Sequence, residues 1–286
     1  MIQIIIKSIL TVKLLCYVTN KDINRKPHSR RAFSLYEVAV VIVIIGIFIS
    51  GIIAADKMVS KFRLAAAKTL ATSSPINSIK ETALWLETSL DNGFNPSEEE
   101  DGATVSLWKD QQNSGNPKVN VVAVGGGPTY ANTINRVHAV EFGKSGSAGY
   151  LQFNASFLNK TDYTIIILEK RKTAGANYFL KSIDGSNADD DKLNLGYLDD
   201  NTVVHSQGGV SYNRDSKVSG YSDSKDKPRL FTFTQSSVEG SKTYINGSLA
   251  AEDATKTAQL SGLTNIGLGK GYTGEIGEIA IFTKAL

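Results

Sequence analysis

The acidic residues of this sequence are of a type that could catalyse the hydrolysis of a glycan. A glycosidase that retains configuration needs two carboxyl groups about 5 to 5.5 Å apart. Glu275 and Glu278 lie three positions apart near the C-terminus. On a regular strand two such residues point to opposite faces and cannot share a substrate. We therefore expect carboxylates that face solvent or a loop, in a chain that is not an enzyme.

Metal-ligating residue types occur, but without the spacing of a zinc site. His138 and His205 are far apart, and the single cysteine, Cys16, leaves the body without disulfides or thiolate ligands. Short acidic runs could offer oxygen ligands to calcium. They are Glu98–Asp101, Asp189–Asp191 and Asp199–Asp200. None shows a fixed ligand spacing, so we expect solvated loops and no metal or other cofactor, with calcium as the open alternative.

Glu37 stands at the edge of a long apolar run. From Val38 to Ala55 the sequence has no charged residue, and about 20 such residues cover a hydrocarbon core of roughly 30 Å. A carboxylate near a lipid-embedded helix end costs a few kcal/mol unless it finds a partner. Glu37 therefore indicates a function. The alternative is that it reaches toward the interface and is stabilised by the helix dipole.

The charges are distributed unevenly. Residues 1–32 hold seven Lys or Arg against one Asp, whereas the rest of the chain holds 24 bases and 27 acids. Basic residues close before the apolar run favour a cytoplasmic N-terminus and a body on the outer side of the membrane. The mildly acidic body argues against nucleic acid as a partner.

The segment Arg30–Glu37 (RRAFSLYE), followed by the apolar run, resembles the class III signal of type IV prepilins and type II secretion pseudopilins. The resemblance implies a leader over residues 1–32, cleaved between Ala32 and Phe33 by a prepilin peptidase of the inner membrane. It also implies N-methylation of Phe33 and an assembly role for Glu37, which would compensate the amine of Phe33 in a neighbouring pilin subunit. Ala32 departs from the commoner Gly, and the leader is long.

A single helix is expected over residues 33–72, spanning the membrane and supporting assembly. Lys57–Leu70 continues the apolar run without Gly or Pro, and Ser73-Ser74-Pro75 provides the stop. The remainder, residues 73–286, forms the head.

The head reads as short β-rich runs separated by Gly, Asn, Asp and Ser, which predicts two packed antiparallel sheets and an α+β chain overall. The clearest strand candidates are Val119–Val124, Val137–Phe142, Thr164–Leu168, Leu230–Gln235, Lys242–Ile245 and Glu278–Phe282. Asn246-Gly247 suits a type I′ hairpin turn between two strands.

Several segments of the head resemble the concanavalin A-like or laminin G-like (LamG-like) jelly roll, over roughly residues 79–286. They are Ile266–Gly269, Gly274–Ile279, Phe282–Leu286 and the segments around Trp85 and Trp108. Asp110–Asn116 is spaced differently from the usual pattern. Members of that fold bind glycans or proteins, or hydrolyse glycans, so the resemblance alone does not choose an activity.

Aromatic residues could supply a platform for a glycan or protein ligand. Trp85 and Trp108 are expected in the core. Tyr197, Tyr212 and Tyr221 lie among Asp, Asn and Gly, and are the candidates for an exposed ligand-binding surface.

Together these features predict a type IV pilin-like, minor subunit whose helix assembles and whose lectin-like head serves adhesion or recognition. It would pass the inner membrane once and then reach a pilus at the cell surface or a periplasmic pseudopilus. The alternatives are a pseudopilin of a type II secretion system and a membrane-tethered glycan hydrolase.

Overall fold

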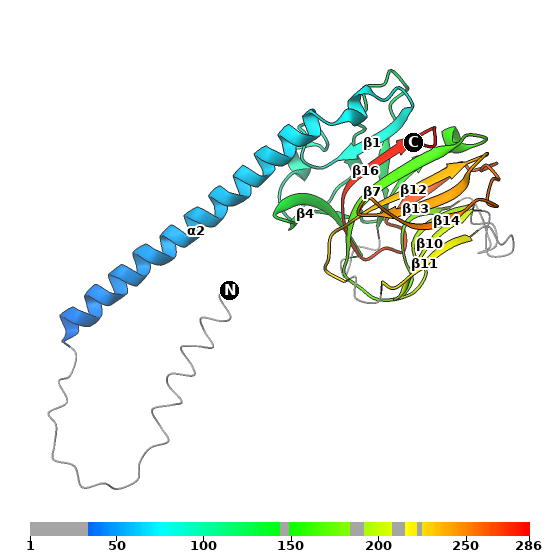
Figure 1. Cartoon of the computed structure of the whole chain (residues 1–286). Coiled ribbons are helices and arrows are strands. Elements are labelled where there is room, and N and C mark those ends of the chain that lie inside the picture. Colours follow the sequence, from blue (N-terminus) through cyan, green and yellow to red (C-terminus); the bar gives the residue numbers. More distant parts are fainter. Residues whose placement is uncertain (1–33, 144–148, 184–191, 208–214, 222–224) are drawn as a thin grey trace, which may run out of the picture. The chain divides into compact units, whose positions relative to one another are not determined.

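The computed structural model describes residues 34–143, 149–183, 192–207, 215–221 and 225–286. A long helix, α2 (Leu35–Thr72), precedes a head built from two antiparallel β-sheets (Figure 1). The expected fold class, a long N-terminal helix followed by an antiparallel β-sandwich, is confirmed. Ala32 and Phe33, the expected cleavage pair, lie outside the described residues.

Helix α2 ends where the sequence predicts. Its last turn gives way at Ser73 and Ser74, whose amides still bond to Thr69 and Ala71 at 3.1 and 3.0 Å. Pro75 then begins the short 3-10 helix η1 (Pro75–Ser78). No residue of α2 is buried, and by length and composition it is apolar enough to cross a membrane.

Contacts along the chain separate two compact units, Met1–Ala54 and Ala55–Leu286. The second unit holds the last turns of α2 together with the head. In that unit Asp56 forms an ion pair with Arg136 at 2.6 Å, and Arg63 Nη1 donates to the carbonyl of Asn135 at 3.0 Å. Several bonds therefore fasten the end of the helix to the head.

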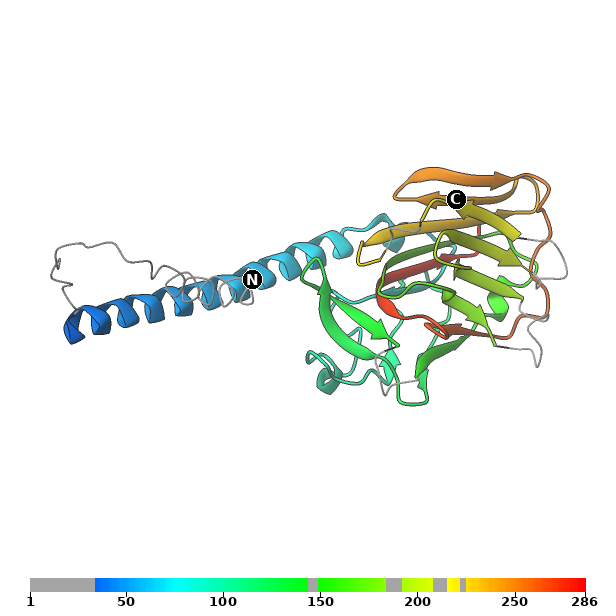
Figure 2. The same cartoon turned by 90° about the horizontal axis from the view of Figure 1, so that it is seen from below.

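The head consists of two sheets whose strands come from distant parts of the chain. One sheet has the order β14-β13-β12-β7-β16-β5-β4, with β1 also paired to β16, and the other has the order β11-β10-β9-β8-β15-β6-β3-β2. The strands are β1 Thr82–Glu87, β2 Leu107–Trp108, β3 Val121–Val124, β4 Thr129–Ile134, β5 Val137–Phe142, β6 Tyr150–Asn154, β7 Tyr163–Arg171, β8 Asn177–Ser182, β9 Leu193–Tyr197, β10 Thr202–Gln207, β11 Asp215–Ser219, β12 Arg229–Ser236, β13 Gly240–Ile245, β14 Ser248–Asp253, β15 Asn265–Leu268 and β16 Gly274–Phe282. In Figure 2 the yellow and orange strands, β10 to β14, gather on one side of the head.

Each strand candidate from the sequence falls on an observed strand, namely β3, β5, β7, β12, β13 and β16. The hairpin is confirmed as well. Asn246 and Gly247 have φ values of 52° and 80°, and Ile245 pairs with Ser248 across the turn.

Strand β16 lies at the centre of its sheet and changes partner along its length. Its start pairs with β5 and its end with β1, while β7 accompanies it throughout on the other side. The change coincides with a β-bulge between Ile276 and Glu278 in the pairing with β7.

The core between the sheets is apolar and rich in aromatic residues, and Trp108, fully buried, belongs to it. Trp85 is equally buried, but in a smaller cluster with Ala280 and Phe282, against which Ala71 of α2 packs. The expectation that both tryptophans are core residues is confirmed.

Candidate functional site

The start of α2 holds Glu37 in a reciprocal pair of hydrogen bonds. The backbone amide of Ser34 donates to Glu37 Oε2 at 2.8 Å, and the amide of Glu37 donates to Ser34 Oγ at 3.1 Å. This arrangement is a capping box, which satisfies two amides that a helix otherwise leaves free. Both side chains are exposed. The capping role was not anticipated from the sequence, although Ser-x-x-Glu is its known signature.

Glu275 and Glu278 lie on one face of β16, so the expectation of opposite faces is wrong. Glu275 pairs with Lys170 and Glu278 with Leu168, and these partners are two residues apart on β7. The bulge inserts one extra residue into β16 and thereby turns both carboxylates to the same side.

Both carboxylates have partners within the head. Glu275 is fully buried rather than solvent-facing, and its oxygens contact Lys172 Nζ at 2.6 Å and Lys170 Nζ at 3.3 Å. Glu278 accepts a hydrogen bond from Trp85 Nε1 at 2.8 Å. Glu275 thus neutralises the charges of two lysines, and Glu278 fixes the buried indole of Trp85.

The acidic runs that are described bind backbone or side-chain donors. The carboxylate of Asp199 accepts the amides of Asn201 and Thr202, each at 2.8 Å, and these bonds lower the pKa of Asp199. Glu98 accepts from Asn95 and Ser106. Asp189–Asp191 lies outside the described residues. Within the described ranges, no group of three or more His, Cys, Asp or Glu side chains is placed to hold a metal ion.

Tyr197 does not form an exposed platform, and that expectation is wrong. It is fully buried, its hydroxyl donates to Glu169 Oε1 at 2.8 Å, and the guanidinium of Arg171 lies 3.9 Å from its ring centroid. The apolar residues that alternate along β9 turn Tyr197 into the core. Tyr221 is half-buried, with Arg229 lying over its ring at 4.7 Å. Tyr212 lies outside the described residues.

Two buried polar clusters were not anticipated. Glu169 accepts from Tyr197 and from Tyr272, the latter at 2.5 Å, and its burial raises its pKa to about 7. In the second cluster, Tyr163 Oη and His205 Nε2 are 2.8 Å apart, and burial lowers the pKa of His205 to about 3. His205 is thus a neutral core residue at physiological pH.

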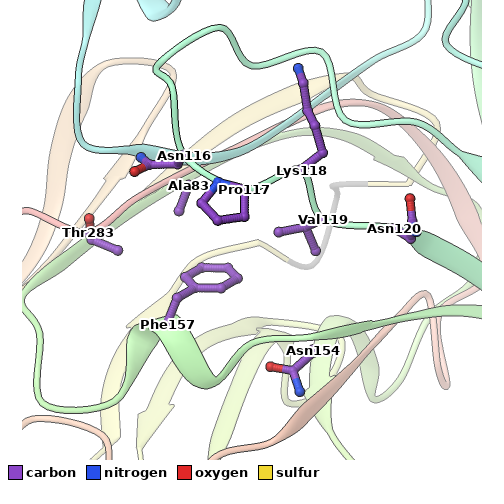
Figure 3. Close-up of a pocket in the computed structure, with 9 residues that line it drawn as sticks. All are labelled: Ala83, Asn116, Pro117, Lys118, Val119, Asn120, Asn154, Phe157 and Thr283. Carbon is purple, nitrogen blue, oxygen red and sulfur yellow. The ribbon is translucent and has the colours of Figure 1, made fainter.

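The head also has a hollow of about 450 Å³, which we call the edge pocket, between the beginning of β1 and the outer strands of the second sheet (Figure 3). Its lining consists of Ala83, Asn116, Pro117, Lys118, Val119, Asn120, Asn154, Phe157 and Thr283. Both sheets contribute, together with the loop before β3 and the 3-10 turn η3 (Ser156–Leu158). The pocket thus combines an aromatic ring with several side-chain amides.

The loop before β3 is fixed by a buried carboxylate. Asp110 accepts the amides of Trp85 and Gln112, each at 3.0 Å, and that of Val119 at 3.1 Å. These bonds hold one wall of the edge pocket against β1. The sequence indicated only that this segment departs from the usual pattern. The Asn residues on either side of Pro117 were the available signal for this polar wall of the pocket.

No protein-family model and no curated protein matches the sequence. Among solved structures, domain 4 of AbnA, a GH43 extracellular arabinanase from Geobacillus stearothermophilus in complex with arabinotriose, is similar over 72% of this chain and 94% of that domain, with 14% identity and a TM-score of 0.50. The binding domain of botulinum neurotoxin DC in complex with SialylT is similar over 73% of this chain and 49% of that one, with 16% identity and a TM-score of 0.51.

The same neurotoxin domain in complex with rat synaptotagmin II is similar with 15% identity and a TM-score of 0.50. This chain spans about half the length of the neurotoxin domain. At such identities the likeness shows the fold alone, which is a β-sandwich.

Proposed function

We propose that this chain is a type IV pilin-like, minor subunit that assembles through α2 and presents its head for adhesion or recognition. The observation that carries the proposal is the sequence Arg30–Glu37 directly before an apolar helix of membrane-spanning length. In this proposal a prepilin peptidase cuts between Ala32 and Phe33, and Phe33 becomes N-methylated.

The proposed assembly contact joins Glu37 to the amine of Phe33 in a neighbouring subunit. A carboxylate next to lipid needs a compensating charge, and a free amine of the neighbour supplies one. The apolar residues of α2 are exposed along its whole membrane-length segment and are available to lipid before assembly and to other helices afterwards.

The proposed role of the head is to bind a glycan or a protein. The similar domains were solved with arabinotriose, SialylT and synaptotagmin II, and these ligands support recognition as the role of this sandwich. The partners of Glu275 and Glu278 favour binding over hydrolysis, because a catalytic pair needs oxygens that reach the substrate.

The proposed location follows from the charge pattern. The N-terminus stays in the cytoplasm, α2 crosses the inner membrane once, and the head lies on the outer side until assembly carries it into a pilus. The same signal would serve a pseudopilin of a type II secretion system, in which case the head stays in the periplasm.

N-terminal sequencing of the mature protein tests the proposal. We expect methyl-Phe followed by Ser-Leu, and recovery of the subunit in pili sheared from cells. An intact leader in cells with an active prepilin peptidase would overturn it. Processed protein that stays in the periplasm and is required for secretion would instead identify the pseudopilin.

A further inference from the structure

The edge pocket has one aromatic wall, Phe157, in a firmly held turn. Leu158 is fully buried beside it, and the amides of Leu158 and Asn159 bond to Ala155 and Ser156, each at 3.0 Å. Phe157 itself packs partly on the core and keeps part of its ring in the pocket (Figure 3). A partly exposed ring on a fixed turn presents a π-face to a ligand at little entropic cost.

Two side-chain amides of the pocket are oriented by hydrogen bonds to the protein, one through its oxygen and the other through its nitrogen. Asn154 Oδ1 accepts from Ser156 N at 3.0 Å and from Ser156 Oγ at 2.6 Å, which leaves its Nδ2 as a donor. Asn116 Nδ2 donates to the carbonyls of Lys80 and Thr82 at 3.1 and 2.9 Å, which leaves its Oδ1 as an acceptor. A fixed donor and a fixed acceptor suit hydroxyl groups, since each hydroxyl can act in both roles.

The lining carries little charge. None of the nine lining residues is acidic, and the one cation, Lys118, bonds through Nζ to the carbonyls of Asp110 and Gln112. Figure 3 shows its side chain directed away from Phe157. A cationic ligand would find no carboxylate in the pocket, and an anionic ligand would have to compete with the backbone carbonyls that engage the Lys118 ammonium.

From these observations we infer that the edge pocket binds an uncharged sugar residue, with a C–H face of the ring on Phe157 and its hydroxyls on Asn154 and Asn116. The inference rests on the proposed recognition function and names its ligand class. A volume of about 450 Å³ falls within the range of small-ligand sites and suits a terminal residue of a glycan rather than a long chain.

The test uses the full-length chain in detergent micelles on an array of neutral and of sialylated or uronic acid-containing oligosaccharides. We expect binding to neutral glycans. Phe157→Leu keeps an apolar contact with the core but removes the ring, and Asn154→Asp keeps the oxygen that accepts from Ser156 but removes the donor. Each variant is expected to weaken binding at least tenfold, as measured by calorimetry with the best neutral glycan.

Val238→Ala, at a residue that is 83% exposed and absent from the pocket lining, is the matched control and should bind as the parent does. Circular dichroism and thermal melts establish that each variant is folded. Binding of neutral glycans that neither pocket variant changes would overturn the inference while leaving glycan recognition intact. Binding restricted to acidic glycans would also overturn it. An array without any binding would overturn both the inference and glycan recognition by the head.

Discussion

Ser34 and Glu37 form two reciprocal hydrogen bonds at the start of α2. The distance is 2.8 Å between Ser34 N and Glu37 Oε2, and 3.1 Å between Glu37 N and Ser34 Oγ. Glu37 therefore has a role within its own helix besides the proposed one between subunits. The proposed cleavage before Phe33 would leave the amide of Ser34 in place, so the same bonds would be available to the mature chain.

Two substitutions separate these roles of Glu37. Glu37→Gln retains an oxygen for the Ser34 amide but removes the charge, whereas Ser34→Ala removes one capping bond, worth about 1 kcal/mol, and keeps the charge. We expect Glu37→Gln to insert into the membrane normally and to be poorly incorporated into pili. Ser34→Ala should be incorporated nearly as well as the parent. Quantitative immunoblots of sheared pili and membranes measure both.

The reverse pattern would contradict the charge-pair role. If Glu37→Gln entered pili normally while Ser34→Ala did not, the carboxylate would serve helix capping alone.

Glu169 should make the head less stable as the pH rises. Its folded pKa is about 7 because of burial, against an ordinary value of 4.5. Its stabilising contribution is thus complete below about pH 4.5 and is lost as the pH rises toward 7, a change on the order of 3 kcal/mol. Glu169→Gln should remove this dependence, which thermal melts between pH 5 and pH 8 would show.

His205 acts in the opposite direction and provides the background for that measurement. Its folded pKa is lowered to about 3, so its contribution is lost as the pH falls below 6.5. Because His205 is present in both proteins, the difference between parent and Glu169→Gln isolates Glu169. Glu239→Gln, at a more exposed carboxylate, is the control. An equal pH dependence in parent and Glu169→Gln would refute the prediction.

Removing one partner of Glu275 should destabilise the head. Lys172 Nζ lies 2.6 Å from Glu275 Oε1 and 2.9 Å from Glu141 Oε1, while the side chain of Glu275 is 0% exposed. Lys172→Met should lower the free energy of unfolding by about 2 kcal/mol, less than for an isolated buried pair because Lys170 remains. Urea titration gives the value.

Lys242→Met is the matched control, because Lys242 pairs with the more exposed Glu239 and Glu252. It should lower the free energy of unfolding much less than Lys172→Met does. Adding Glu275→Gln to Lys172→Met should recover part of the loss. Equal effects of the two single substitutions would show that burial of Glu275 does not matter.

The turn between β13 and β14 requires glycine at position 247 because of its positive φ angle, and not because a side chain would lack room. Gly247 has a φ of 80°, and a Cβ added there would meet no atom within 4 Å. Gly247→Ala should therefore cost about 1 kcal/mol through backbone strain alone. Ser248→Ala, at the next and exposed position, should leave the thermal midpoint unchanged. If Gly247→Ala left the stability of the head unchanged, this result would argue against the positive φ angle in the turn.

The parts of the fold that follow from local chemistry were predictable from the sequence. The uncharged run after Glu37 and the Ser-Ser-Pro stop define α2, and alternating β-rich runs with Asn246-Gly247 locate the strongest strands. Short strands such as β2 and β15 were missed, because a few residues carry too little periodic pattern and are held in place by their neighbours in the sheet.

The candidate site was less accessible to sequence reasoning. The bulge in β16 reverses the expected facing of Glu275 and Glu278, and it arises where β16 changes partner from β5 to β1. Gly277, at the bulge, was the local signal for it. Tyr197 was misplaced for a related reason: its polar neighbours belong to the following turn, while its own position faces the core. Phe157 and Asn116, far apart in the sequence, line the same pocket because Phe157 follows β6, Asn116 precedes β3, and these two strands pair in one sheet.

The edge pocket adjoins the first residues of the head after the helix. Ala83, the second residue of β1, and Thr283, directly after β16, both line it, and β1 joins α2 through η1 alone. A pulling force on a ligand held there would pass from Asn116 to the carbonyls of Lys80 and Thr82, beside the connection to α2, and into the second sheet through Asn154 and Phe157. The ion pair of Asp56 with Arg136 and the bond of Arg63 to Asn135 would give this load a second route to the helix, through the turn between β4 and β5.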